Sequence, residues 1–185
     1  MSQDALVTVL RAADLDPNTR FGCSEVRDWP EGQLAALEAS GLLRRAGHAR
    51  SVECDGCGEG CVEDVEFLDA GDEAAPRAYV VCRRRDDIGR VRVDLGCLTQ
   101  WAVDWGRLAR ALASGLGISA EPQVVIESRV WRLGVAKLGG ARRDALMLTG
   151  AAHPDAQGLL DDTPLTNTRA TALVFVPAEL PSWAK

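Results

Sequence analysis

The sequence is poor in histidine and lysine, and it has no long hydrophobic run. Only two histidines occur among the 185 residues, His48 and His153, and neither lies in a nucleophile or metal-binding motif. No G-x-S-x-G, P-loop or G-x-G-x-x-G pattern is present. The longest apolar runs, such as residues 173–176, fall far short of the roughly 20 residues that span a bilayer. These absences favour a non-enzymatic protein without a membrane partner.

The chain also lacks an excess of positive charge. Its net charge is −6 and its pI is about 5.0, which argues against a protein whose whole surface binds nucleic acid but leaves a local basic patch open. Lysine occurs only at Lys137 and Lys185, so arginine supplies nearly all the cations. Arginine binds phosphate and carboxylate groups bidentately, although a GC-rich bacterial genome also favours its codons. With no signal-peptide pattern near Met1, we expect a cytoplasmic location.

Six cysteines are present, and three of them lie within eight residues. Such close spacing favours metal ligation over disulfide bridging. The segment 54–61 reads CDGCGEGC, and its glycines permit the tight turns that a metal-binding loop needs. A further cysteine ends a predicted strand and can return to this loop. We predict one structural zinc ion bound by Cys54, Cys57, Cys61 and Cys82.

The arrangement over residues 54–82 resembles a zinc ribbon or zinc knuckle, although the second half has only Cys82 where a ribbon has a cysteine pair. An iron–sulfur cluster, a redox C-x-x-C site and a histidine ligand from His48 remain alternatives. Four thiolates leave no open coordination position, so the metal would be structural. Cys23 and Cys97 are distant in sequence, and we predict that they are buried thiols rather than ligands.

The N-terminal third predicts helices at 4–13, 25–28 and 30–40, followed by an extended hairpin over 42–53 with Gly47 near its turn. Over residues 4–53, and in particular in the stretch LEASGLLRRAGHARSVEC, this order resembles prokaryotic winged-helix regulators. The resemblance implies a nucleic-acid-binding fold. The segment that would be the recognition helix offers Glu31, Gln33 and Glu38 and no basic side chain, so contact with a protein suits the fold equally.

Further strands are predicted at 62–68, 77–82, 89–94, 124–138, 144–149 and 171–176, with Gly139-Gly140 as a turn. Further helices are predicted from Asp104 to about residue 116 and around 154–160. The fold class is therefore α+β: a winged-helix-like domain (1–53), a zinc-binding β-hairpin module (54–95) and a small α/β domain (96–185). We expect Trp101, Trp105 and Trp131 in the core rather than stacked on bases.

Basic residues are concentrated in short segments. Five occur between residues 129 and 143 without an acid, and the segment 42–53 is also positive. A basic hairpin can contact phosphate groups, so the predicted contacts to nucleic acid or to an acidic partner are Arg129, Arg132, Lys137, Arg142, Arg143, Arg44, Arg45 and Arg50.

Together these patterns predict a zinc-stabilised, non-enzymatic nucleic-acid-binding accessory or regulatory protein of a bacterium. The alternative is a protein–protein adaptor subunit of a larger bacterial assembly. A metal-dependent nuclease built on Asp104, Glu127 and Arg129 is a further alternative, although the lysine usual in such sites is absent.

Overall fold

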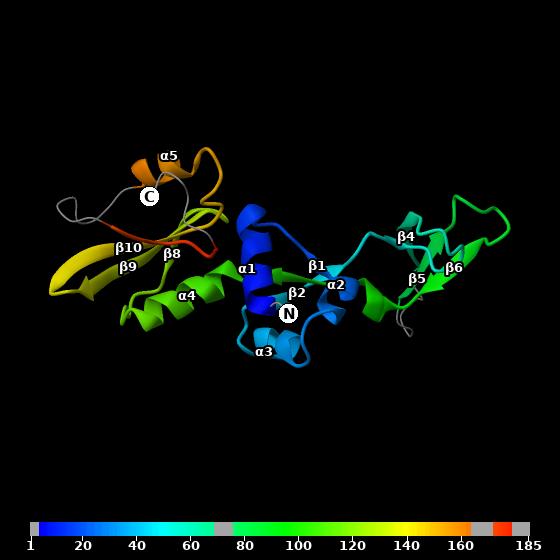
Figure 1. The fold of residues 1–185 in the computed structure, drawn as a ribbon, viewed down its shortest axis with the longest axis horizontal. Coiled ribbons are helices and arrows are strands. Elements are labelled where there is room, and N and C mark those ends of the chain that lie inside the picture. Colours follow the sequence, from blue (N-terminus) through cyan, green and yellow to red (C-terminus); the bar gives the residue numbers. More distant parts are fainter. Residues whose placement is uncertain (1–3, 69–75, 164–171, 179–185) are drawn as a thin grey trace. The chain divides into compact units, whose positions relative to one another are not determined.

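The structure, a computed structural model, describes residues 4–68, 76–163 and 172–178. Its helices and strands follow one another along the chain as drawn in Figure 1. The helices are α1 (Ala5–Leu15), α2 (Cys23–Arg27), α3 (Gln33–Ala39), the 3-10 helix η1 (Leu95–Leu98), α4 (Trp105–Gly115) and α5 (Ala156–Asp161). The strands are β1 (Phe21–Gly22), β2 (Leu43–His48), β3 (Ser51–Glu53), β4 (Val62–Leu68), β5 (Arg77–Val81), β6 (Arg90–Val93), β7 (Thr99–Val103), β8 (Gln123–Ile126), β9 (Val130–Leu138), β10 (Ala141–Leu148) and β11 (Leu173–Phe175). Helices and sheets are both substantial, as the predicted α+β class requires.

The chain folds into two compact units, each built from separate segments. The first unit comprises residues 1–19, 29–44 and 103–185, and the second comprises residues 20–28 and 45–102. Helices α1 and α3 therefore belong to the first unit and α2 to the second. Whether the predicted segments 1–53, 54–95 and 96–185 behave as separate domains stays a prediction.

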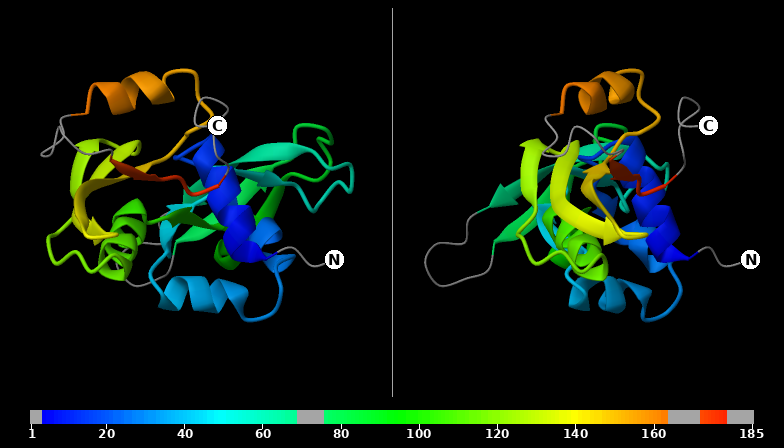
Figure 2. Two further views of the ribbon diagram at one scale, coloured as in Figure 1. Left: turned by 60° about the vertical axis from the view of Figure 1, so that its left-hand side comes forward. Right: turned by 90° about the vertical axis from the view of Figure 1, so that its left-hand side faces the viewer.

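The first unit contains a four-stranded sheet in the order β11-β10-β9-β8. The antiparallel pair β9–β10 turns at Gly139 and Gly140, which adopt φ 56° and 81° as the predicted turn requires. Successive side chains of a strand point to opposite faces, and each face has its own helix. On one face the Trp131 ring lies 6.1 Å from that of Trp105 on α4, while on the other Val130 packs in a cluster with Ala156 of α5. Figure 2 shows the two helices on opposite sides of this sheet.

Two local predictions in this unit have clear outcomes. Asp104 caps α4 as predicted, because its carboxylate accepts a hydrogen bond from the Arg107 N–H at 2.9 Å. The predicted single strand 124–138 is wrong, because a turn divides it into β8 and β9. Ser128 adopts φ 56°, and the Arg129 N–H donates to the Ile126 carbonyl at 3.0 Å, which closes the turn.

The second unit contains two small sheets, one of order β1-β7-β2 and one of order β3-β4-β5-β6. The strands of the second sheet are antiparallel, with Val65 opposite Val80 and Val80 opposite Val91. Val80 is fully buried and packs with Cys54 and Cys82 in the cluster of apolar residues beneath this sheet. The predicted strands 62–68, 77–82 and 89–94 correspond to β4, β5 and β6.

The predicted hairpin over residues 42–53 is wrong. Strands β2 and β3 belong to different sheets, because the backbone between them bonds to separate partners. The Ala49 N–H donates to the Leu98 carbonyl at 2.7 Å, whereas the Arg50 carbonyl accepts from the Val65 N–H at 2.8 Å. Because no wing hairpin follows α3, the structure does not confirm a winged-helix unit.

Candidate metal centre

Four cysteine side chains converge at one end of the sheet β3-β4-β5-β6. Cys54 directly follows β3, Cys57 and Cys61 lie in the connection to β4, and Cys82 directly follows β5. Their Sγ atoms all lie within 4.8 Å of one another. The separation is 3.2 Å between Cys57 and Cys61 and 3.9 Å between Cys61 and Cys82. None of these thiols is in a disulfide, so all four can act as ligands.

Glycines and one backbone hydrogen bond shape the loop 54–61. Gly58 and Gly60 adopt φ 66° and 65°, a left-handed conformation that is costly for other residues. A Cβ at Gly56 would lie 2.7 Å from a methyl carbon of Val91, so only glycine fits there. The Cys54 N–H donates to the Cys61 carbonyl at 2.8 Å and closes the loop. Backbone conformation and close packing therefore explain the glycines from which the sequence predicts a metal-binding turn.

Backbone N–H groups point at two of the sulfur atoms. The Glu59 N–H donates to Cys57 Sγ at 3.5 Å, and this bond is the main reason that the pKa of Cys57 falls to about 7. Burial raises the pKa of Cys82, while the N–H groups of Arg84 and Arg85 oppose that rise. Hydrogen bonding to Cys57 raises the pKa of Cys61. N–H donors to sulfur stabilise the thiolate form, which is the form that binds metal.

The geometry suits a single tetrahedral ion. Zinc–sulfur bonds of about 2.3 Å place the sulfur atoms of a tetrahedron roughly 3.8 Å apart. The separations of Cys61 Sγ from Cys57 Sγ and Cys82 Sγ, 3.2 and 3.9 Å, bracket that value. A four-iron cluster would spread the four thiolates, because each binds a different iron. Cys54 and Cys82 are 1% and 3% exposed, so half of the ligand set is withdrawn from solvent. A site of four thiolates holds its ion without a position for a substrate.

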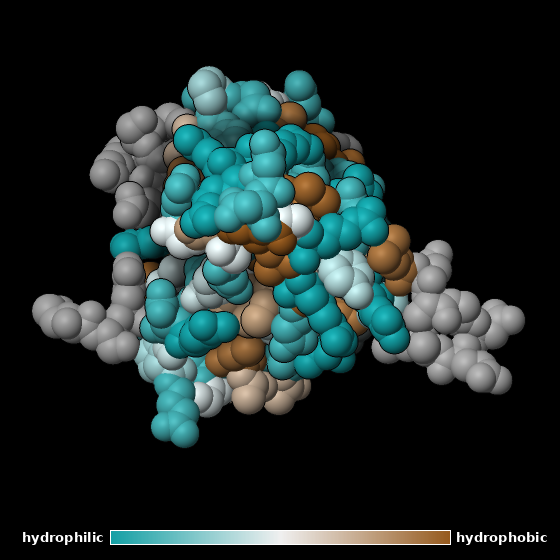
Figure 3. Space-filling view, turned by 90° about the vertical axis from the view of Figure 1, so that its right-hand side faces the viewer, coloured by the Kyte–Doolittle hydropathy of each residue, from teal (hydrophilic) through white to brown (hydrophobic). Residues whose placement is uncertain are grey.

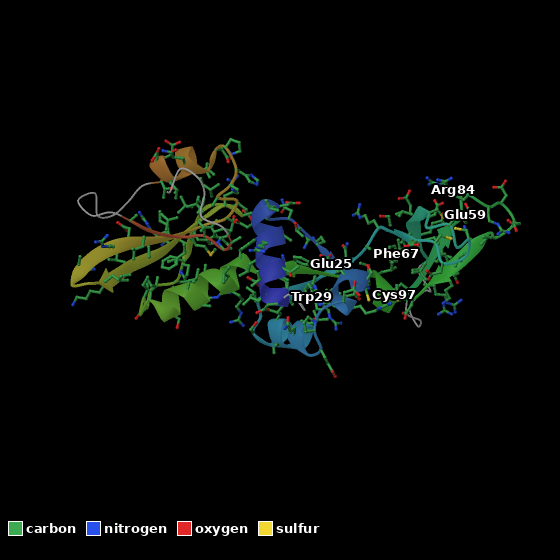
Figure 4. The ribbon with its side chains drawn as sticks, in the orientation of Figure 1. Glu25, Trp29, Glu59, Phe67, Arg84 and Cys97 are labelled. Atoms are coloured by element: carbon green, nitrogen blue, oxygen red, sulfur yellow. The ribbon has the colours of Figure 1, made fainter. Side chains whose placement is uncertain are left out.

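The remaining cysteines and His48 lie outside this cluster. Cys97 is exposed on η1 and Cys23 is only half-buried on α2, so the prediction that both are buried thiols is wrong. Figure 4 shows Cys97 well away from Glu59 and Arg84, which flank the cysteine cluster. The His48 ring instead lies 6.0 Å from the ring of Phe67. Among the described residues the metal-ligand geometry therefore joins the four predicted cysteines alone.

The basic segment 129–143 does not form one continuous positive surface. Arg129 is a structural residue: its guanidinium binds both carboxylate oxygens of Asp155 at 2.9 and 3.1 Å and the carbonyls of Thr149 and Gly150. Arg142 and Arg143 are adjacent on β10 and so point to opposite faces of the sheet. The two exposed members, Lys137 and Arg142, lie opposite each other across β9 and β10.

One part of this segment lines a hollow. Arg132, which is half-buried, and Arg142 share a hollow of about 470 Å³ with the carboxylate residue Glu121. Glu121 itself pairs with Arg110 at 3.1 Å.

The other predicted segment is well exposed. Arg44 and Arg45 on β2, and Arg50 beyond it, are all accessible to solvent. Among the described residues, the guanidinium groups of Arg44 and Arg50 form no ion pair or hydrogen bond. On the face drawn in Figure 3, hydrophilic side chains predominate and apolar side chains form small patches among them.

Residues considered for catalysis or base stacking have structural roles. Asp104 caps α4, and the Arg129 guanidinium pairs with Asp155, so both side chains make structural contacts. As predicted, the three tryptophans are core residues, because they are no more than 7% exposed: Trp101, Trp105 and Trp131.

Sequence reasoning missed an exposed pair of rings. His48 and Phe67 lie together in the second unit, with ring planes inclined by 34°. No local sequence pattern indicates this pair, because the two residues belong to strands of different sheets.

Comparison with protein-family models, with curated proteins and with solved structures finds no match for this chain. In the part of the chain that the structure describes, no helix has both the length and the hydrophobicity needed to cross a membrane.

Proposed function

We propose that this chain is a zinc-stabilised, non-enzymatic nucleic-acid-binding accessory or regulatory protein of the bacterial cytoplasm. The zinc would be bound by the cysteine cluster, defined as Cys54, Cys57, Cys61 and Cys82. Two features support a structural role: four cysteine Sγ atoms within 4.8 Å of one another can all ligate one ion, and the residues packed around them are apolar. A reducing compartment keeps such thiols free of disulfides and available to the metal.

The observation that carries the nucleic-acid proposal is the exposure of Arg44 and Arg50 without a carboxylate partner among the described residues. Some exposed arginines of the second unit are instead paired with carboxylates. Arg83 pairs with Asp64 at 3.3 Å, and Arg85 pairs with Asp87 at 2.6 Å. In a chain of net charge −6, unpaired guanidinium groups are favourable contacts for phosphate.

Oligonucleotide binding at different salt concentrations tests this proposal. We expect the full chain to bind labelled oligonucleotides at low salt and to lose affinity steeply between about 50 and 200 mM salt. The double variant Arg44→Ala/Arg50→Ala should bind more weakly and show a shallower salt dependence. A matched control is Arg110→Ala, which removes the same kind of charge from a residue already paired with Glu121.

The alternative function, a protein–protein adaptor, makes the opposite prediction. An adaptor should show no binding to single-stranded or duplex oligonucleotides even at low salt, where electrostatic attraction is strongest. The same result would refute the nucleic-acid proposal.

Metal content is a separate question. Elemental analysis of protein purified without added metal answers it, and about one zinc per chain is expected.

A further inference from the structure

Two exposed rings define a distinct place on the second unit. His48 ends β2, and Phe67 lies near the end of β4, where Figure 4 labels it. The ring centroids are 6.0 Å apart. Phe67 lies opposite Ala78 of β5, a small buried residue, on the apolar face of the sheet. The Phe67 side chain therefore extends the apolar face towards solvent, and Phe67 is 41% exposed.

The rings border a hollow that also contains charged groups. This aromatic hollow is about 670 Å³ in volume and is lined by His48, Arg50, Asp64, Val65 and Phe67. The bond from the Val65 N–H to the Arg50 carbonyl at 2.8 Å attaches Arg50 to β4, and Ser51 pairs with Asp64 across β3 and β4. The backbone beneath the hollow is thus held in place, while the side chains of His48, Arg50, Asp64 and Phe67 are exposed.

The hollow combines three features that can bind parts of a nucleotide. An exposed phenyl ring offers a surface on which any base can stack. The Arg50 guanidinium has no ion-pair partner among the described residues and can bind a phosphate oxygen. The Asp64 carboxylate pairs with Arg83 at 3.3 Å and adds a hydrogen-bond acceptor at the rim. A volume of about 670 Å³ lies within the usual range for ligand sites, about 300–1,000 Å³.

We infer that the aromatic hollow is a base-stacking subsite for single-stranded nucleic acid, in which Phe67 and His48 contact one base and Arg50 binds an adjoining phosphate. This inference rests on the proposed function and adds both the strand preference and the contacting residues. Bases in a duplex are already stacked on their neighbours, so a protein ring reaches their faces only in a single strand. The buried tryptophans cannot serve this purpose, whereas Phe67 can.

The test compares Phe67 variants of the full chain for binding to a short labelled oligonucleotide, both as a single strand and as a duplex. Loss of one stacking contact corresponds to about tenfold weaker single-strand binding for Phe67→Ala. The slope of affinity against salt should stay unchanged, because no phosphate contact is lost. Arg50→Ala should instead reduce that slope by about 0.7, the value for one contact to a single strand. Phe67→Trp should bind about as tightly as the wild type, because it keeps an aromatic face.

Two controls separate stacking from folding. Leu68→Ala changes the next residue on β4, which is 43% exposed and points to the opposite face of the sheet, and it should bind as the wild type does. Phe67→Leu keeps an apolar side chain without an aromatic face, and it should bind about as weakly as Phe67→Ala while retaining wild-type zinc content.

Wild-type affinity in both Phe67→Leu and Phe67→Ala, with weakened binding by Arg50→Ala, would overturn the stacking subsite and leave the nucleic-acid function standing. Equal affinity of the wild type for duplex and single strand would likewise overturn it. If the wild type binds neither the duplex nor the single strand at low salt, both the proposed function and the subsite are refuted.

Discussion

Replacing Cys82 by serine should remove the metal and unfold the sheet β3-β4-β5-β6. Cys82 is 3% exposed and belongs to both the cysteine cluster and the apolar cluster around Val80. A serine hydroxyl is a poor zinc ligand, and its burial beside three thiols adds a polar group in place of a sulfur. Both changes act on the same end of the sheet.

The expected magnitude follows from the size of that apolar cluster. Its buried members are Cys54, Val80 and Cys82, and the apolar residues around them are only partly buried. Full burial of an aliphatic side chain contributes about 1.5–3 kcal/mol, so the cluster contributes on the order of 10 kcal/mol. Structural zinc in small modules contributes about 10–16 kcal/mol. Since whole domains are stable by only about 5–15 kcal/mol, loss of the metal should unfold this part of the chain.

Thermal unfolding monitored by circular dichroism, together with zinc analysis, measures the effect. The first unit has its own apolar cluster, around Val130 and Leu148, so a transition from that unit should persist in the variant. The matched control is Cys97→Ser, which changes an exposed cysteine outside the cysteine cluster and should melt as the wild type does. A Cys82→Ser protein that lacks zinc and yet melts like the wild type would refute the reasoning.

Three further predictions concern the metal and the first unit. Cobalt substitution should give the absorption spectrum of a tetrahedral tetrathiolate site, and an octahedral spectrum would contradict the assigned ligands. Arg129→Met should lower the free energy of unfolding by about 2 kcal/mol, because the bonds to Thr149 and Gly150 are lost, without changing oligonucleotide affinity. Burial raises the pKa of Asp14, whose carboxylate accepts the Gly150 N–H at 2.7 Å. A native state that binds the proton more tightly than the unfolded state loses stability as pH rises through the raised pKa. In denaturant titrations from about pH 4 upward, the stability of the wild type should fall relative to that of Asp14→Asn, and parallel pH profiles would contradict it.

The sequence sufficed for features whose cause is local. The glycine-rich spacing of Cys54, Cys57 and Cys61 predicts a turn that gathers thiols, and the strand pattern ending at Cys82 supplies the fourth ligand. The cap at Asp104 is likewise set by residues within one helical turn. The loop and the cap need no knowledge of distant partners, because the hydrogen bonds that form them connect near neighbours. Cys82 lies 21 residues beyond Cys61 and joins the cluster through the pairing of β4 with β5.

Features that depend on distant partners could not be predicted in this way. The hairpin over 42–53 fails because Ala49 bonds to Leu98 and Arg50 to Val65, and neither partner is signalled by the segment itself. The role of Arg129 is set by Asp155, which lies 26 residues further along the chain. A cluster of basic residues in sequence therefore overstated the basic surface, because strand alternation and ion pairing divide its members.

The cysteine cluster and the aromatic hollow are linked through one hairpin, and this link makes a final prediction. Strand β4 begins at Val62, directly after Cys61, and carries Phe67 near its far end, while β5 ends directly before Cys82. Zinc would thus fix the end of the hairpin whose opposite end presents Phe67, without itself touching a ligand in the hollow. Removing zinc with a chelator should therefore abolish single-strand binding, and adding zinc back should restore it.

The control is a titration of the intact protein with zinc in excess of one ion per chain. If zinc acts only by folding the hairpin, excess metal should change neither the affinity nor its salt dependence, because it adds no contact to phosphate. Binding that survives complete removal of zinc would show that the hairpin folds without the metal, and binding that keeps rising with excess zinc would show that the ion bridges to the nucleic acid. Either result would contradict a purely structural role for the cysteine cluster, since that role requires one ion, saturable and remote from the ligand.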